Sequence, residues 1–199
     1  MRRRGTTESL VTIGMRGDGD EAMTEGTAIP LLEEIVSAQR DIIAQTTGRP
    51  AAQTPQVWAL YKEVQDYFDQ GMRVPDDVTL LFADDNWGNL RRLPSPGDER
   101  PGGSGVYFHF DYVGGPRNYK WLNTVQIGRT WEQMDLARQA GADRLWVVNV
   151  GDLKPMEVPI DFFLDQAWDP EAMTVERMAG WSRDWAQAQF GEAQADEIA

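Results

Sequence analysis

Five short apolar runs constrain what this chain can fold into. Most of them are continuously apolar rather than alternating, which is typical of strands buried on both faces of a parallel sheet. Segments with the apolar spacing of helices separate the runs, so strand and helix alternate along the chain. The runs are SLVTIGM (9–15), QVWALY (56–61), VTLLFA (78–83), VYFHFDY (106–112) and RLWVVNV (144–150).

Five helices are expected between and after these runs. The first places isoleucine, leucine and valine at mostly helical spacing and is followed by Gly48, a residue type that commonly ends helices. The last two are amphipathic and follow the final strand, which predicts a helical region packed on what precedes it. The expected helices are 29–46, 62–71, 124–140, 159–170 and 174–191.

Unbroken alternation of strand and helix predicts an α/β fold with a parallel sheet, either open and doubly wound or closed as a barrel. Neither the glycine fingerprint of dinucleotide-binding folds nor the phosphate-binding loop occurs in the sequence. One connection, 94–105, is rich enough in glycine and proline to predict flexibility.

The charge of the chain excludes several function classes. Nineteen basic and 32 acidic side chains give a net charge of -13, which repels nucleic-acid phosphates and anionic membranes. Because the chain has no cysteine, disulfide frameworks and thiolate metal sites are excluded. The basic start MRRRGTTES is followed by polar residues rather than by the apolar core of a signal peptide, so no targeting segment is predicted.

Polar and ionisable side chains gather where each apolar run ends. The carboxyl ends of parallel strands are where α/β barrels carry their chemistry. Acidic loops are the default in so acidic a chain, but five successive strand ends with such groups favour function over solvation. These residues are Arg16, Asp18 and Asp20, then Tyr61 and Glu63, then Asp84, Asp85 and Asn86, then His109, Asp111 and Tyr112, then Asn149 and Asp152.

Four long stretches resemble the glycoside hydrolase family 115 xylan α-1,2-glucuronidases. The first two are GMRGDGDE and LYKEVQDYFDQGMRVPDDVTLLFADDNWGNLRRLP. The other two are GGSGVYFHFDYVGGPRNYKWLNT and VVNVGDLKPMEVPIDFFLDQAWDP, so the resemblance covers almost the whole chain from about Glu8.

The resemblance implies a fragment of a larger hydrolase with an incomplete TIM-like barrel of about five parallel strands, followed by C-terminal helices. Residues 1–8 are expected to be a disordered or non-native start, 9–152 the partial barrel with catalytic residues, and 153–199 the start of the helical region. The family removes glucuronic acid or its 4-O-methyl ether from xylan with inversion and without a cofactor. A periplasmic or secreted parent enzyme is implied, with processing of large oligosaccharides inside the cell as the alternative. Since family members often pair, a homodimeric parent enzyme is also an open alternative.

An inverting glycosidase needs one protonated carboxyl as general acid and one carboxylate, about 6.5–9.5 Å away, to activate water. By resemblance, Glu63 is the general acid, while Asp84 and Asp20 are candidates for the base or for hydrogen bonds to the sugar. Arg16 matches an arginine in the substrate pocket of the family, and it is the best candidate to pair with the uronate carboxylate, for which a planar guanidinium is suited. Without the family, a salt bridge from Arg16 to Asp18 or Asp20 is the simpler interpretation.

Tyr61, Asn86, His109 and Tyr112 match substrate-binding residues of the family. His109 is the only histidine, so a zinc site has no second imidazole or thiolate ligand and no metal is predicted, although the acidic loops leave Ca²⁺ or Mg²⁺ a minor alternative. Residues three apart on a strand point to opposite faces unless a bulge intervenes, which leaves the pairing of His109 with Tyr112 unexplained.

The expected partner is xylan or an aldouronic oligosaccharide, with no nucleic acid or membrane. A non-catalytic carbohydrate-binding or vestigial fragment stays open, as does a barrel enzyme acting on a phosphorylated or carboxylated metabolite. Arg16, Glu63, Asp84 and Tyr112 are expected at the C-terminal rim of the sheet. Because five strands leave unpaired edges, the isolated chain is expected to be poorly soluble or molten, and inactive.

Overall fold

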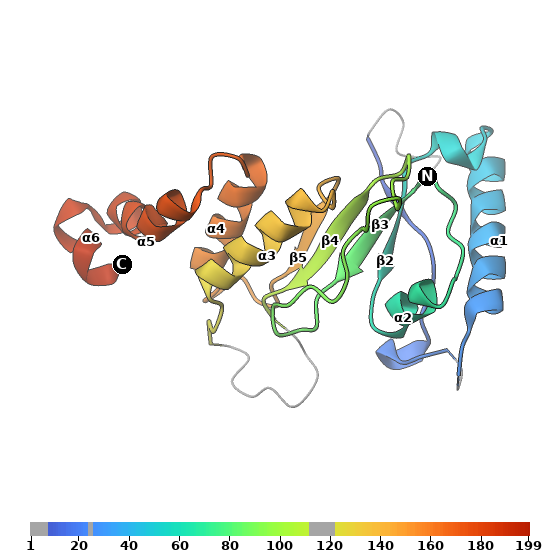
Figure 1. The fold of residues 1–199 in the computed structure, drawn as a ribbon, viewed down its shortest axis with the longest axis horizontal. Helices are drawn as coiled ribbons and strands as arrows, with labels where there is room; N and C mark the ends of the chain where they lie inside the picture. The colour runs from blue at the N-terminus through green and yellow to red at the C-terminus, as the bar shows by residue number, and fades with distance from the viewer. Residues whose placement is uncertain (1–7, 24–25, 112–121) are drawn as a thin grey trace. The chain divides into compact units, whose positions relative to one another are not determined.

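The computed structural model describes residues 8–23, 26–111 and 122–199, and Figure 1 shows the path of the chain. The described residues form two compact units. The first lies within 1–83, 91–107 and 140–147, and the second lies within 84–90, 108–139 and 148–199.

The strands of the described residues form one sheet in sequence order, β1-β2-β3-β4-β5, and are parallel. Neighbours in the sheet are neighbours in the chain, which is the winding of a barrel and not of a doubly wound sheet, where the order reverses. The predicted incomplete α/β barrel is therefore confirmed. The strands are β1 (Val11–Thr12), β2 (Gln56–Leu60), β3 (Val78–Ala83), β4 (Ser104–His109) and β5 (Trp146–Asn149).

The core of the first unit explains the continuous apolar runs. All six residues of β3 are buried, because helices and neighbouring strands cover the sheet. Helix α1 (Ile29–Thr47) buries Leu32, Val36 and Ile43 in the same cluster. It ends as predicted at Gly48, whose φ of 70° suits glycine and whose N–H donates to the Ala44 carbonyl. Helix α2 (Glu63–Asp69) is shorter than expected.

The glycine-rich connection before β4 is attached to the first unit rather than free along its length. The Arg100 guanidinium donates to the carbonyls of Val78 at 3.1 Å and Pro75 at 2.6 Å. Residues Ser104 and Gly105, expected in the connection, belong to β4. Burial of Arg100 lowers the pKa of its guanidinium, which neighbouring Asp76 partly opposes.

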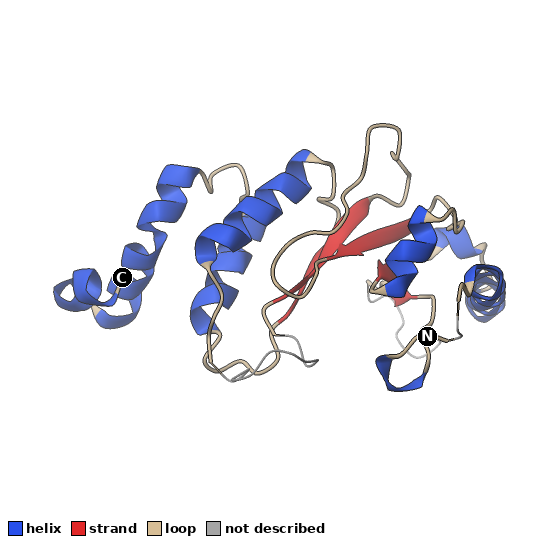
Figure 2. Ribbon diagram, turned by 60° about the horizontal axis from the view of Figure 1, so that its bottom comes forward, coloured by secondary structure: helices blue, strands red, loops and turns tan. Residues whose placement is uncertain are grey.

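Among its described residues, the second unit contains four helices, which Figure 2 shows in blue together with those of the first unit. Its core places the Phe162 ring edge-on to Trp181 at 5.1 Å, with Met173 beside them. The Trp131 indole N–H donates to the Met173 carbonyl at 2.5 Å. The sequence does not predict the last helix, of which only Ala195 is buried. These helices are α3 (Ile127–Gln139), α4 (Glu157–Trp168), α5 (Val175–Phe190) and α6 (Glu192–Ile198).

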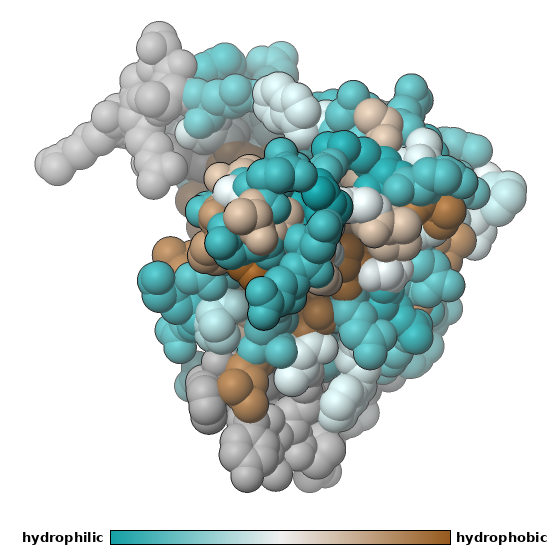
Figure 3. Space-filling view, turned by 90° about the vertical axis from the view of Figure 1, so that its left-hand side faces the viewer, coloured by the Kyte–Doolittle hydropathy of each residue, from teal (hydrophilic) through white to brown (hydrophobic). Residues whose placement is uncertain are grey.

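Apolar side chains remain exposed on the C-terminal helices. Leu164 and Trp168 of α4 and Phe190 of α5 are 56%, 91% and 54% exposed. The space-filling view of Figure 3 shows apolar side chains between hydrophilic ones on the face it presents. Among the described residues, no helix combines the length and apolar character needed to cross a bilayer.

Gly105→Ala is expected to destabilise the first unit. A Cβ on Gly105 would overlap the Leu145 carbonyl oxygen and approach the Leu81 side chain at 2.9 Å, so β4 would have to shift. Overpacking of this kind costs about 1–3 kcal/mol. Equilibrium unfolding in denaturant, or resistance to limited proteolysis, measures the loss. Gly180→Ala in α5 is the control, because its Cβ meets nothing within 4 Å and alanine favours a helix; equal stability of the two variants would contradict the packing argument.

Candidate active site

A bidentate ion pair joins Arg16 to Glu63 in the first unit. Arg16 Nε donates to Glu63 Oε1 at 2.9 Å, and Nη2 donates to Oε2 at 2.8 Å. The two side chains are 16% and 22% exposed, so the pair is partly removed from water without being sealed off. Planar matching of this kind is the strongest arrangement of a guanidinium and a carboxylate.

Glycine positions the loop that carries Arg16. Gly14 has a φ of 88°, and a Cβ there would overlap the indole of Trp58, so both its conformation and its close packing require glycine. The Gln39 side chain binds both polar groups of the Gly14 backbone, accepting from N–H at 2.8 Å and donating to the carbonyl at 3.2 Å. Gly17 N–H donates to the Glu21 carbonyl at 2.9 Å, which closes the loop. The charged, glycine-spaced stretch is therefore an ordered turn around Arg16.

Glu63 is the first residue of α2, directly after a strained position. Lys62 adopts φ 50° and ψ -124°, a conformation that residues with a Cβ rarely take. The turn is held by hydrogen bonds from the Val64 and Gln65 N–H groups to the Tyr61 and Lys62 carbonyls, at 3.1 and 3.2 Å. Backbone strain of this type clusters at functional sites, where surrounding structure maintains it. It therefore marks the strand-to-helix turn at Glu63 as a candidate site.

Tyr61 supports the ion pair through its ring. The Arg16 guanidinium carbon lies 5.3 Å from the Tyr61 ring centre, and Lys62 Nζ lies 5.2 Å from it. A second ring, that of Tyr107 on β4, is 5.8 Å away. Cations near an aromatic face are attracted to its electron density. Aromatic contact and carboxylate together fix the Arg16 guanidinium plane.

A buried acid–imidazole pair lies in the second unit. Asp84 Oδ1 is 2.6 Å from His109 Nδ1, and the two side chains are 0% and 3% exposed. Asp84 follows β3, and His109 is the last residue of β4. Within the described part of the chain, Asp84 Oδ2 is buried and has no hydrogen-bond partner. A carboxylate at Nδ1 fixes the orientation of the imidazole ring, which suits the pair to holding a hydroxyl group.

The loop after Asp84 adds Asn86, whose φ of 66° is tolerated by asparagine better than by most residues. The remaining predicted site residues are Asp20 and Tyr112. Asp20 ends a short 3-10 helix, Asp18–Asp20, but its side chain lies outside the described residues, as does the whole of Tyr112. Their roles stay predictions.

Two features of these groups were not anticipated from the sequence. Lys62 gives no compositional signal of strain, because its conformation is imposed by the fold. Gln65 reads as a surface residue of a helix, yet it is buried and its Oε1 accepts from the Ala83 N–H at 3.2 Å. It thereby ties α2 to the end of β3. No group of three histidine or acidic side chains among residues 8–23, 26–111 and 122–199 could hold a metal ion.

The chain is similar to a family of glycoside hydrolases. A model of "Glycosyl hydrolase family 115" matches residues 1–199. No curated protein sequence gives a match. A solved structure described as a family GH115 4-O-methyl-alpha-glucuronidase with specificity for decorated arabinogalactans is 34% identical and superposes with a TM-score of 0.88. The match covers 95% of this chain and 26% of that one, so this chain spans about a quarter of the length of that enzyme.

The family model covers the loop around Arg16, the strained turn at Glu63 and the Asp84–His109 pair. On this evidence, the chain belongs to glycosyl hydrolase family 115.

Proposed function

We propose that this chain supplies catalytic residues for the removal of glucuronic or 4-O-methylglucuronic acid from a polysaccharide. The observation that carries the proposal is the Arg16–Glu63 pair, because its guanidinium is already held in the geometry that binds a carboxylate through two oxygens. Family membership supports glycoside hydrolysis, and the related enzyme of known structure acts on glucuronate.

The uronate and Glu63 compete for the same guanidinium. Both Glu63 oxygens accept hydrogen bonds from Arg16. A general acid must instead contact the glycosidic oxygen. A uronate that pairs with Arg16 displaces Glu63 from the guanidinium and leaves its carboxyl group available for that contact.

In the proposed reaction, Glu63 gives its proton to the glycosidic oxygen as the bond from that oxygen to the anomeric carbon breaks. A water molecule attacks the anomeric carbon from the opposite face and passes a proton to a second carboxylate, which inverts the configuration. Asp20 and Asp84 are the candidates for that base. By resemblance to the family, the candidates for binding sugar hydroxyls are Tyr61, Asn86, His109 and Tyr112.

The identity of the polysaccharide that bears the glucuronate is also proposed. Xylan or an aldouronic oligosaccharide is the substrate that we favour, and the specificity of the related enzyme for decorated arabinogalactans makes a galactan backbone the alternative. In both cases the group removed is an α-linked glucuronate. Release assays with oligosaccharides of the two types decide between them.

Glu63→Gln is expected to reduce uronic acid release about 100-fold or more, since the amide cannot donate a proton as a general acid does. It should also tighten the binding of free glucuronate, because glutamine cannot form an ion pair with Arg16. A suitable protein is a chimera in which this chain replaces the matching segment of the related 4-O-methyl-α-glucuronidase, assayed for release and titrated by calorimetry.

Glu157→Gln is the matched control, because Glu157 also lies in the first turn of a helix and is 48% exposed beside Lys154. Its release rate should equal that of the unmodified chimera. Unchanged turnover in Glu63→Gln would exclude Glu63 as the general acid. Weaker glucuronate binding by this variant would contradict the displacement of Glu63 from Arg16 by the uronate.

Arg16→Lys is expected to raise the dissociation constant for glucuronate about tenfold, because an ammonium group cannot make two parallel hydrogen bonds to a carboxylate. Titration calorimetry with glucuronate measures the change. Arg177→Lys, which alters an exposed ion pair to Asp184 on α5, is the control and should bind as the unmodified protein does. Equal affinity in the Arg16 and Arg177 variants would exclude Arg16 from uronate binding.

A further inference from the structure

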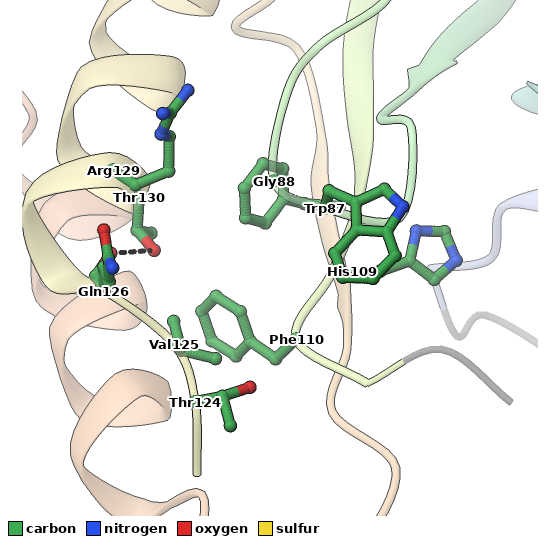
Figure 4. Close-up of a pocket in the computed structure, with 10 residues that line it drawn as sticks. Trp87, Gly88, His109, Phe110, Thr124, Val125, Gln126, Arg129 and Thr130 are labelled. Carbon is green, nitrogen blue, oxygen red and sulfur yellow. Dashed lines mark hydrogen bonds between the residues drawn. The ribbon is translucent and has the colours of Figure 1, made fainter. Parts of the chain in front are cut away.

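A small pocket in the second unit carries an exposed tryptophan at its edge. Its volume is about 280 Å³, near the lower limit of small-molecule sites. The Trp87 side chain is 57% exposed. Figure 4 shows Trp87 and Phe110 on one side of the pocket and Gln126 and Arg129 on the other, with Val125 between them. The pocket thus combines aromatic faces with groups that can bind hydroxyls.

The loop that presents Trp87 is held by its own hydrogen bonds. Asp85 Oδ1 accepts from the Trp87 N–H at 2.9 Å and from the Asn89 N–H at 3.1 Å, while Oδ2 accepts from the Asn89 side chain at 2.7 Å. Leu90 N–H donates to Gln133 Oε1 at 2.8 Å, which fastens the end of the loop to α3. The indole is therefore displayed on an ordered support, which lowers the entropic cost of stacking on it.

The pKa of Asp85 reflects the hydrogen bonds that stabilise this loop. Partial burial raises the pKa of Asp85, but hydrogen bonds from the Asn89 side chain and from the Trp87 and Asn89 backbone lower it more, so the pKa lies below its ordinary value. The contribution to loop stability is present above the ordinary carboxyl pKa and is lost as pH falls through the lowered one. At neutral pH the loop is in its stabilised state.

The polar side of the pocket favours a neutral ligand. Arg129 Nη1 donates to Asn89 Oδ1 at 2.5 Å, so part of its guanidinium is engaged by the loop. The chain carries a net charge of -13, which opposes the entry of a second anionic group. The Gln126 and Thr124 side chains are exposed at the pocket and can both donate and accept.

We propose that this pocket is a subsite for one neutral sugar ring of the polysaccharide backbone that bears the glucuronate. The indole of Trp87 stacks on the C–H face of the ring, as an aromatic body suits an apolar surface, while Gln126, Thr124 and Arg129 bind its hydroxyls. His109 forms part of the wall, so the subsite adjoins the Asp84–His109 pair. The proposal rests on the proposed function, since it assigns a further part of the same substrate.

The test is titration calorimetry of the 199-residue chain with two neutral probes, xylotetraose and a β-1,3-galactotetraose. One of the probes should bind, and Trp87→Ala should raise its dissociation constant at least tenfold. Trp168→Ala is the matched control, because Trp168 is 91% exposed on α4 and does not line the pocket. Asp85→Ala, which keeps the indole but releases its loop, should also weaken binding.

Near-ultraviolet circular dichroism establishes that each variant is folded. Where a variant of the 199-residue chain is not folded, the same substitution is tested in the chimera with the related 4-O-methyl-α-glucuronidase. Absence of binding by the unmodified protein, or equal affinity in the Trp87 and Trp168 variants, would overturn the subsite. Titration with glucuronate separates the two proposals. If a neutral probe binds through Trp87 and glucuronate does not bind, the proposed function is excluded and the subsite is kept. If glucuronate binds and neither neutral probe binds, the subsite alone is excluded.

Discussion

Parallel pairing of strands that follow one another in sequence is the constraint on which this structure depends. Each parallel pair needs a crossover that carries the chain back, so every strand ends in a turn that leads into the next connection. Those turns are where the ionisable side chains are found: Glu63 after β2 and Asp84 after β3. The buried strands supply rigid support. Glu63 is 22% exposed at its turn, whereas the Asp84 side chain is buried and its Oδ1 contacts His109. Within β3, buried Thr79 offsets its lost hydration by donating its hydroxyl to the Gly102 carbonyl at 2.6 Å.

The sequence predicts those elements of the fold that depend on neighbouring residues, such as continuous apolar runs and glycines that end helices. VTLLFA coincides with β3 because every residue in it is buried, and Gly48 ends α1 because its backbone is left-handed. The first run, by contrast, has seven residues but forms a strand of only two, since Gly14 turns the chain at φ 88°. Helix α6 escapes prediction because only Ala195 of it is buried, which leaves no apolar stripe to recognise.

The sequence and its family resemblance propose site residues, but they do not predict which residues contact one another. A salt bridge of Arg16 to a close neighbour, Asp18 or Asp20, was the simplest interpretation of the sequence, whereas the structure joins it to Glu63, 47 residues away. Pairing across that distance follows from the packing of β1 beside β2, which no local pattern contains. Likewise, Asp84 and His109 are 25 residues apart and meet only because β3 and β4 are adjacent. The family resemblance proposed roles for these residues, but the partner of each charge had to come from the fold.

The strain at Lys62 sets stability against function at one position. A lysine with positive φ and ψ -124° costs about 1–3 kcal/mol that a glycine would largely avoid, yet glycine would also widen the range of turns open to the chain before α2. Any protein selected only for resistance to heat would gain by relaxing this turn, and would lose the fixed angle at which Glu63 leaves the strand. Residue 62 is thus a place where engineering for robustness and engineering for turnover should diverge.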